Sequence, residues 1–142
     1  MFKTVEIHFP SDPELLSVMR AAVAKVCHIA GFSKKMTSKI VLALDEACSN
    51  IIRHTYKGEI DQEIKIISRI KPTKLEFYLL DQGDPVDSTK IKSRELHDVR
   101  PGGLGVYLIK SVMDEVKWEK GSDNGNRLYM YKTRPKRRQS ES

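Results

Sequence analysis

The chain has 142 residues, of which 39% are hydrophobic and 31% are charged, and its formal net charge at pH 7 is +6. This length suits one domain with a sizeable core rather than two. No apolar run approaches the roughly 20 residues that a membrane-spanning helix needs, and the N-terminus lacks a signal-peptide core, so we expect a cytoplasmic protein with no membrane contact. Cys27 and Cys48 lie in apolar helical patterns and are expected to be buried thiols.

The positive charge is concentrated at the C-terminus, where residues 132–142 carry five of the basic side chains. We therefore expect a folded domain over residues 1–132 and a disordered basic tail over residues 133–142. No aromatic residues alternate with these charges and no helix-turn-helix pattern precedes them, so we expect no direct nucleic-acid binding. The tail is better suited to solubility or to steering towards an acidic partner.

The first predicted elements are a strand and a helix. Apolar and polar residues alternate over residues 4–9, which predicts a strand that Pro10 ends. Ser11 or Asp12 can cap the helix that follows. Its apolar stripe runs at helical spacing to Ile29, and we expect it to end at the glycine two residues later.

A second helix, capped by Ser33 and extending to about Tyr56, carries the polar pair on which the functional prediction depends. Its apolar residues recur at helical spacing, while Glu46 and Asn50 lie one turn apart on the opposite side. An isolated pair of this kind is usually a solvated polar face. The apolar stripe comprises Ile40, Leu44, Ala47, Cys48 and Ile51.

Two further strands are predicted over residues 64–70 and 75–81. Asp81 has the same parity as the apolar residues of its strand, so it should continue their face of the sheet. If that face meets the helices, Asp81 is a carboxylate at the rim of the core and needs a partner. A core network could supply one, and so could a ligand.

The rest of the chain begins with a polar connection over residues 81–102, which is long for a compact domain, and such loops are often lids or binding loops. A short helix is expected around residues 88–96. A glycine-rich stretch then opens a helix over residues 104–112, and a last pair of strands follows over residues 115–119 and 127–132. This order predicts an α+β fold, a two-layer sandwich with helices on one face of a mixed, mostly antiparallel sheet.

Three of the polar residues suit a magnesium-nucleotide site. Asn50 offers a neutral oxygen to a hard cation that keeps several of its waters. Glu46 can orient or deprotonate a hydroxyl near a terminal phosphate. Asp81 can accept a hydrogen bond from an exocyclic amine, which would select adenine over guanine.

The glycines suit the same site. Gly83 allows a tight turn or a close approach to the base. Gly102, Gly103 and Gly105 leave backbone N–H groups accessible at a helix start, where the helix dipole favours phosphate, although such glycines are equally often a hinge. The pattern is neither a P-loop, since it lacks the Lys-Ser/Thr ending, nor a Rossmann loop, since it follows a polar loop rather than a strand.

These three stretches together resemble a known family. Residues 46–56 look like the N-box of the GHKL ATP-binding superfamily (gyrase, Hsp90, histidine kinases and MutL), residues 81–85 its G1 box and residues 102–105 its G2 box. The chain is most similar to the branch of anti-sigma factor serine/threonine kinases. The resemblance implies a Bergerat fold and a homodimer that binds ATP with Mg²⁺. It also implies that the dimer holds a sigma factor and phosphorylates a small anti-sigma factor antagonist.

Carried over residue by residue, the resemblance makes Glu46 the catalytic base and Asn50 the magnesium ligand, with Asp81 as acceptor of the adenine amine. The remaining nucleotide-binding positions are Gly83, Gly102, Gly103, Leu104 and Gly105.

The chain departs from the superfamily pattern at two places near the base. Asp84 stands where many members have a second glycine. Asn126 and Arg127 stand near the position at which many relatives have a pair of threonines. No phosphoacceptor-histidine helix precedes the domain, which argues against a complete histidine kinase. Two alternatives stay open beside the anti-sigma kinase. One is a nucleotide-dependent binding module without phosphotransfer, and the other is a kinase of an antagonist-like domain in a pathway with no sigma factor.

Overall fold

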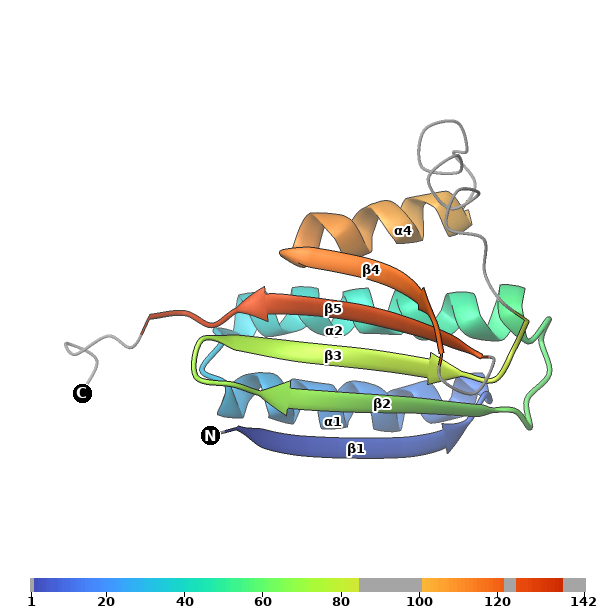
Figure 1. Ribbon diagram of the computed structural model, residues 1–142, viewed down its shortest axis with the longest axis horizontal. Helices are drawn as coiled ribbons and strands as arrows, with labels where there is room; N and C mark the ends of the chain where they lie inside the picture. The colour runs from blue at the N-terminus through green and yellow to red at the C-terminus, as the bar shows by residue number, and fades with distance from the viewer. Residues whose placement is uncertain (1, 85–100, 122–124, 137–142) are drawn as a thin grey trace.

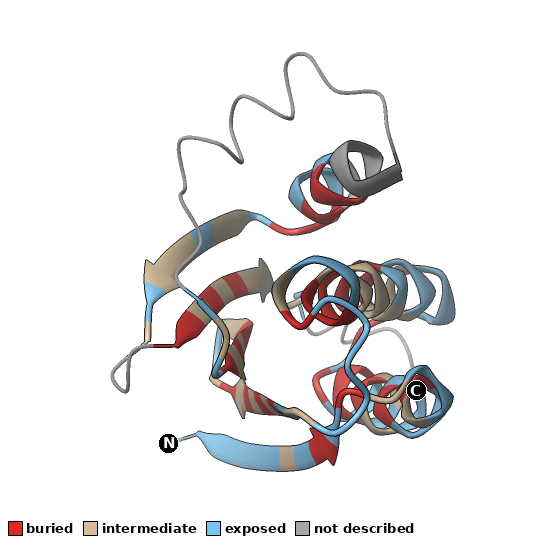
Figure 2. Ribbon diagram, turned by 90° about the vertical axis from the view of Figure 1, so that its right-hand side faces the viewer, coloured by how far each residue is buried: buried red, intermediate tan, exposed pale blue. Residues whose placement is uncertain are grey.

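The computed structural model describes residues 2–84, 101–121 and 125–136, and only the backbone of residues 101–104. The chain forms two layers, with a five-stranded sheet on one side and helices on the other (Figures 1 and 2). The strands are β1 (Lys3–Pro10), β2 (Glu63–Ile70), β3 (Lys74–Asp81), β4 (Glu115–Lys120) and β5 (Asn126–Thr133). The helices are η1 (Pro13–Leu15), α1 (Leu16–Ile29), α2 (Lys34–Asn50), η2 (Ile51–Thr55) and α4 (Pro101–Val112).

The sheet has the order β1-β2-β3-β5-β4, and its four described pairings are all antiparallel. The expected α+β sandwich is confirmed, and in the described strands the mostly antiparallel sheet has no parallel pair. β3 lies at the centre, where its end residue Asp81 pairs with Ile64 of β2 on one side and with Asn126 of β5 on the other.

The first helical segment begins as a 3₁₀ turn, η1, and continues as α1. Asp12 is the residue that caps it, because its Oδ1 accepts from the backbone N–H of Glu14 at 3.0 Å. Ser11, the other predicted cap, is instead fully buried, and its hydroxyl donates to the backbone oxygen of Glu59 at 2.6 Å. It therefore ties the end of β1 to the connection that precedes β2.

The helix predicted up to Tyr56 is present, but its last part differs in geometry. Ser33 caps it as expected, with its hydroxyl oxygen accepting from the N–H of Met36 at 3.1 Å. The α-helix ends at Asn50 and continues as the π-helix η2 up to Thr55. Wider turns of this kind often occur at functional sites, and this one changes the directions in which the residues after Asn50 point.

The core lies between the helices and the inner face of the sheet. Its largest fully buried side chains come from α1, α2, α4 and the three inner strands, and burial of each contributes roughly 1.5–3 kcal/mol. The two cysteines belong to this core, as expected. The fully buried side chains include Phe77, Met19, Ile40, Leu44, Ile64, Ile66, Leu75, Leu79, Ile109 and Met130.

None of the helices in the described part of the chain is long and apolar enough to cross a membrane. The short helix expected around residues 88–96 lies outside the described residues, and so do residues 137–142 of the expected tail. Arg134, just after β5, is held by the folded part, because its guanidinium donates to the backbone oxygens of Ala30 at 2.9 Å and Lys71 at 2.8 Å.

Candidate functional site

The three stretches singled out in the sequence lie at one end of the molecule, on the right in Figure 1. The end of α2 with η2, the end of β3 and the start of α4 all meet there. α4 packs beside α2, on the same face of the sheet (Figure 2). The fold therefore brings a polar helix face, a strand-end carboxylate and a glycine-rich helix start into one region.

Glu46 and Asn50 are half-buried and lie against the backbone of α4. A Cβ atom added to Gly105 would lie only 2.7 Å from Glu46 Oε2 and 3.4 Å from Asn50 Nδ2. A side chain at position 105 would therefore push the carboxylate away. The glycine is needed here for close approach, and the result is a polar cradle between two helices.

Arg53, one turn after Asn50, contacts both polar side chains. Its Nη2 donates to Asn50 Oδ1 at 3.0 Å and lies 4.0 Å from Glu46 Oε2. A cationic group thus already lies beside the two oxygens that were predicted to face a metal and a phosphate. The sequence prediction gave Arg53 no role, although its spacing of three residues from Asn50 and seven from Glu46 places it on the same helix face.

Asp81 is 5% exposed, as its parity in β3 predicts. Its Oδ1 accepts from the backbone N–H of Gly83 and from Asn126 Nδ2, both at 2.9 Å. Burial raises the pKa of this carboxyl, while the hydrogen bonds from Asn126 and Gly83 act in the opposite direction. The group is thus a buried acceptor with one oxygen held firmly in place.

The turn after Asp81 packs against η2. A Cβ atom added to Gly83 would collide with the methyl group of Thr55. The turn can therefore pack this closely against η2 only because residue 83 has no side chain. Asn126 Nδ2 also donates to the backbone oxygen of Asp84 at 2.8 Å. The sequence indicated Asn126 only as a departure from the family pattern, and its contacts depend on the β3–β5 pairing.

Gly102, Gly103 and Leu104 lie in the first turn of α4, which begins at Pro101. Proline is common at the first position of a helix, where its missing N–H is not needed. The helix start expected at the glycine-rich stretch is therefore present. The N-terminal turn of a helix carries free backbone N–H groups and a positive dipole end, which favour anionic groups such as phosphate.

The donor set fits a hard cation held together with a phosphorylated ligand. In the described residues no group of three or more His, Cys, Asp or Glu side chains could form a complete metal cage. Mg²⁺ does not need one, because it usually binds through one or two protein oxygens together with phosphates and waters. The amide oxygen of Asn50, predicted as the magnesium ligand, offers an oxygen of this kind, and the Glu46 carboxylate lies beside Gly105 next to it.

A family model described as the histidine kinase-like ATPase domain matches residues 9–132. The chain belongs to this family. Membership in the histidine kinase-like ATPase family makes nucleotide binding a property of the chain, and the match covers all three stretches that form the site.

Relatives with curated names include the serine-protein kinase RsbW of Listeria monocytogenes serovar 1/2a, which is 34% identical over 125 residues. That alignment covers 82% of this chain and 80% of the relative. The serine-protein kinase RsbW of Bacillus velezensis is 30% identical over 127 residues, which cover 83% of this chain and 79% of the relative.

Among solved structures, the chain resembles the RsbU and RsbW domains of a Mycobacterium tuberculosis protein with a TM-score of 0.65. The match covers 95% of this chain and 33% of that chain at 14% sequence identity. At this identity the likeness shows the histidine kinase-like ATPase fold and nothing about activity.

Proposed function

We propose that the chain is an ATP-dependent serine/threonine protein kinase that phosphorylates a small anti-sigma factor antagonist and, as an anti-sigma factor, holds a sigma factor. The observation that carries the proposal is the cradle in which Glu46 and Asn50 face the backbone of Gly105. The proposal is also supported by similarity to relatives that are named serine-protein kinases. It covers a kinase domain over residues 1–132 with a basic tail over residues 133–142.

ATP would lie along this end of the molecule, with its base at Asp81 and its phosphates at the first turn of α4. Asp81 accepts a hydrogen bond from the exocyclic amine of adenine, and Gly83 keeps the turn free of a side chain beside the base. Gly102, Gly103, Leu104 and Gly105 offer backbone N–H groups to the phosphates.

Asn50 would hold Mg²⁺ through its amide oxygen, with Glu46 close to the same cation. When bound, the ion supplies charge that shields the phosphates and orients them for in-line transfer. The Nη2 of Arg53 already donates to Asn50 Oδ1, so the ion would bind through the second lone pair of that oxygen or in place of this hydrogen bond.

Glu46 is the base of the proposed reaction. Its carboxylate accepts the proton of a serine or threonine hydroxyl on the antagonist, while the hydroxyl oxygen forms a bond to the γ-phosphorus. The bond between that phosphorus and the bridging oxygen breaks, and ADP leaves. Most of the rate enhancement in such a reaction comes from positioning and charge stabilisation, and a general base typically contributes about 10²–10⁴-fold.

Both proposed protein partners, the sigma factor and the antagonist, are separate polypeptide chains. We propose a homodimer that holds the sigma factor in the ATP state and exchanges it for the antagonist. The unphosphorylated antagonist then releases the sigma factor.

A Glu46→Gln variant tests the proposed chemistry. It keeps the size of the side chain and removes the base, so it should bind Mg-ATP like the wild type and transfer phosphate about 10²–10⁴-fold more slowly. The antagonist is first identified by pull-downs with and without ATP. The measurement is then single-turnover transfer from radiolabelled ATP to this antagonist, alongside calorimetry with Mg-ATP. Transfer at the wild-type rate would remove Glu46 from the reaction.

A further inference from the structure

The turn over residues 81–84 is held by two side chains that the proposed reaction does not use. We infer that Tyr56 and Asn126 are positioning residues for Asp81 and that they set the preference of the site for adenine. The inference rests on the proposed function, because it takes the Asp81 end of the site as the end that receives the base.

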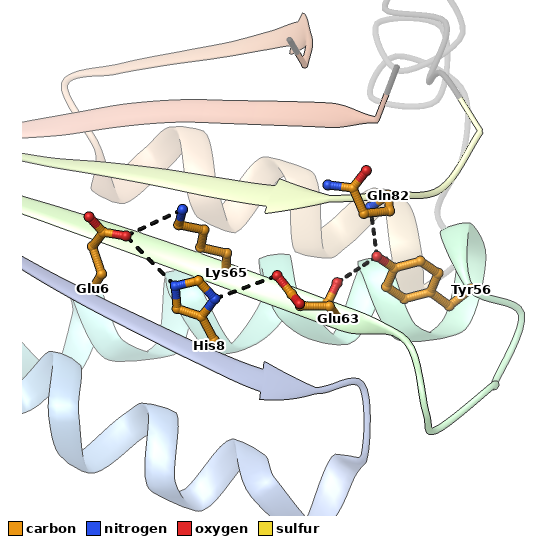
Figure 3. A network of polar contacts seen from close by, with 6 residues as sticks. All are labelled: Glu6, His8, Tyr56, Glu63, Lys65 and Gln82. Carbon is orange, nitrogen blue, oxygen red and sulfur yellow. Dashed lines mark hydrogen bonds and ion pairs between the residues drawn. The ribbon is translucent and has the colours of Figure 1, made fainter. Parts of the chain in front are cut away.

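The hydroxyl of Tyr56 connects the end of η2 to the first residue of β2 and to the residue that follows β3 (Figure 3). It donates to the backbone oxygen of Glu63 at 2.6 Å and accepts from the backbone N–H of Gln82 at 2.7 Å. Tyr56 is 6% exposed, and burial raises the pKa of its hydroxyl, so the proton that it donates to Glu63 stays in place at neutral pH. Gln82, the residue after Asp81, is thereby fixed to the helix end.

The other end of this connection is itself anchored. Glu63 is the first residue of β2 and pairs with Pro10 of β1. Next to it, Gln62 exchanges two hydrogen bonds with the fully buried Ser11, one from Ser11 N–H to Gln62 O at 2.6 Å and one from Gln62 N–H to Ser11 Oγ at 3.1 Å. The carbonyl group of Glu63 therefore has a fixed position in the sheet. Because the Tyr56 hydroxyl bonds to both this carbonyl and the N–H of Gln82, it holds the turn at a fixed position relative to the sheet.

Asn126 holds the turn from β5. It is 8% exposed and lies opposite Asp81 in the strand register. One amide nitrogen donates both to Asp81 Oδ1 at 2.9 Å and to the backbone oxygen of Asp84 at 2.8 Å, so it reaches both ends of the turn. Together with Tyr56 on Gln82, it leaves the turn little freedom to change shape.

A fixed carboxylate is what discrimination between purines requires. A carboxylate only accepts hydrogen bonds, whereas adenine presents an amine and hypoxanthine presents a carbonyl oxygen at the corresponding position. A site built to hydrogen-bond one group rejects the analogue that lacks it, provided that the acceptor is held to within about 0.5 Å and 10–20° of the productive geometry. Loosening the turn should therefore weaken adenine binding and leave hypoxanthine binding almost unchanged.

The test compares the dissociation constants of Mg-ADP and Mg-IDP, measured by calorimetry, in Tyr56→Phe and in the wild-type chain. Tyr56→Phe removes both hydrogen bonds of the hydroxyl, of which the one from the Gln82 N–H holds the turn, and it should bind Mg-ADP about tenfold more weakly. Its affinity for Mg-IDP should stay within about twofold, so the ADP/IDP ratio falls.

The matched control is Tyr129→Phe. It also removes a tyrosine hydroxyl, one that donates to Glu76 Oε2 at 2.6 Å from the middle of β5. Its parity places it on the sheet face that the helices do not cover. This control should lose stability in the same way as Tyr56→Phe but keep both dissociation constants.

The possible outcomes distinguish failure of the inference from failure of the proposed function. Wild-type binding of Mg-ADP with an unchanged ADP/IDP ratio in Tyr56→Phe, or an equal loss for both nucleotides, overturns the inference alone. Absence of Mg-ADP binding by the wild-type chain overturns the proposed function and the inference with it. If the circular dichroism of Tyr56→Phe shows a lost fold, Asn126→Ala carries the same comparison, with the same expected fall in the ratio.

Discussion

Gly105→Ala should slow the proposed phosphate transfer and leave the stability of the fold almost unchanged. The added methyl group would lie 2.7 Å from Glu46 Oε2, about 0.7 Å closer than the 3.4 Å at which ordinary van der Waals contact begins. The carboxylate is the end of a flexible side chain, so it should withdraw while the backbone of α4 stays in place. Displacement of a catalytic group by about 1 Å can cost about 10²-fold in rate. We therefore expect phosphate transfer to fall by roughly 10–10²-fold.

Stability should change little in the same variant. Alanine favours a helix interior over glycine by about 0.8–1.0 kcal/mol, and forcing Glu46 off its rotamer costs about 0.5–1.5 kcal/mol. These opposing effects should leave the free energy of unfolding within about 1 kcal/mol of the wild type. Urea unfolding measures this quantity, and single-turnover transfer from ATP measures the rate.

A double-mutant cycle shows whether Gly105 acts through Glu46. If the methyl group matters only because it moves the carboxylate, then Gly105→Ala combined with Glu46→Gln should transfer phosphate no more slowly than Glu46→Gln alone. Additive losses, or a Gly105→Ala variant with the wild-type rate, would refute the reasoning from the close approach.

Three further predictions follow from the same region. Asn50→Ala should weaken Mg-ATP binding far more than it changes folding, and calorimetry at matched circular dichroism should detect this; unchanged affinity would rule out the metal role. Asp81→Asn should raise the free energy of unfolding at pH 7 while weakening ATP binding. Burial raises the pKa of Asp81 in the folded chain, so the wild type loses stability as the pH rises from the ordinary aspartate pKa through the raised one, and the neutral amide does not. Equal pH profiles of unfolding for the two chains would contradict this. Finally, sigma-factor and antagonist affinities should differ between ATP, ADP and no nucleotide, because a ligand shifts an equilibrium only by its differential affinity; equal affinities, or a monomer in light scattering at micromolar concentration, would remove the proposed switch.

The local features of this fold could be predicted from the sequence because they depend on neighbouring residues. The burial of Asp81 follows from its parity in an apolar strand, and the start of α2 follows from Ser33. Both depend on a short periodicity or a single cap, which tertiary packing did not override in this chain.

The contacts between the stretches could not be predicted in the same way. Asn126 reaches Asp81 across 45 positions of the sequence, and only the pairing of β3 with β5 brings them together. The contact of Arg53 with Asn50 is different, because residues three positions apart are neighbours on a helix surface, and it could have been predicted from the spacing. Tyr56 could have been noticed, since a tyrosine at the buried end of an apolar stripe needs a partner for its hydroxyl.

The pairing of β3 with β5 also bears on how this protein can change during evolution. The chain leaves β3 after Asp81 and pairs with β3 again only from Asn126, which lies opposite Asp81, so α4 and the edge strand β4 belong to the segment between these two paired residues. Insertions and deletions inside that segment can alter what surrounds Glu46 and Asn50 without moving Asp81 or Asn126. The proposed base site at Asp81 and the proposed phosphate site beside Glu46 and Asn50 can therefore change separately, and under the proposed function one fold could acquire new partners while its base site stays the same.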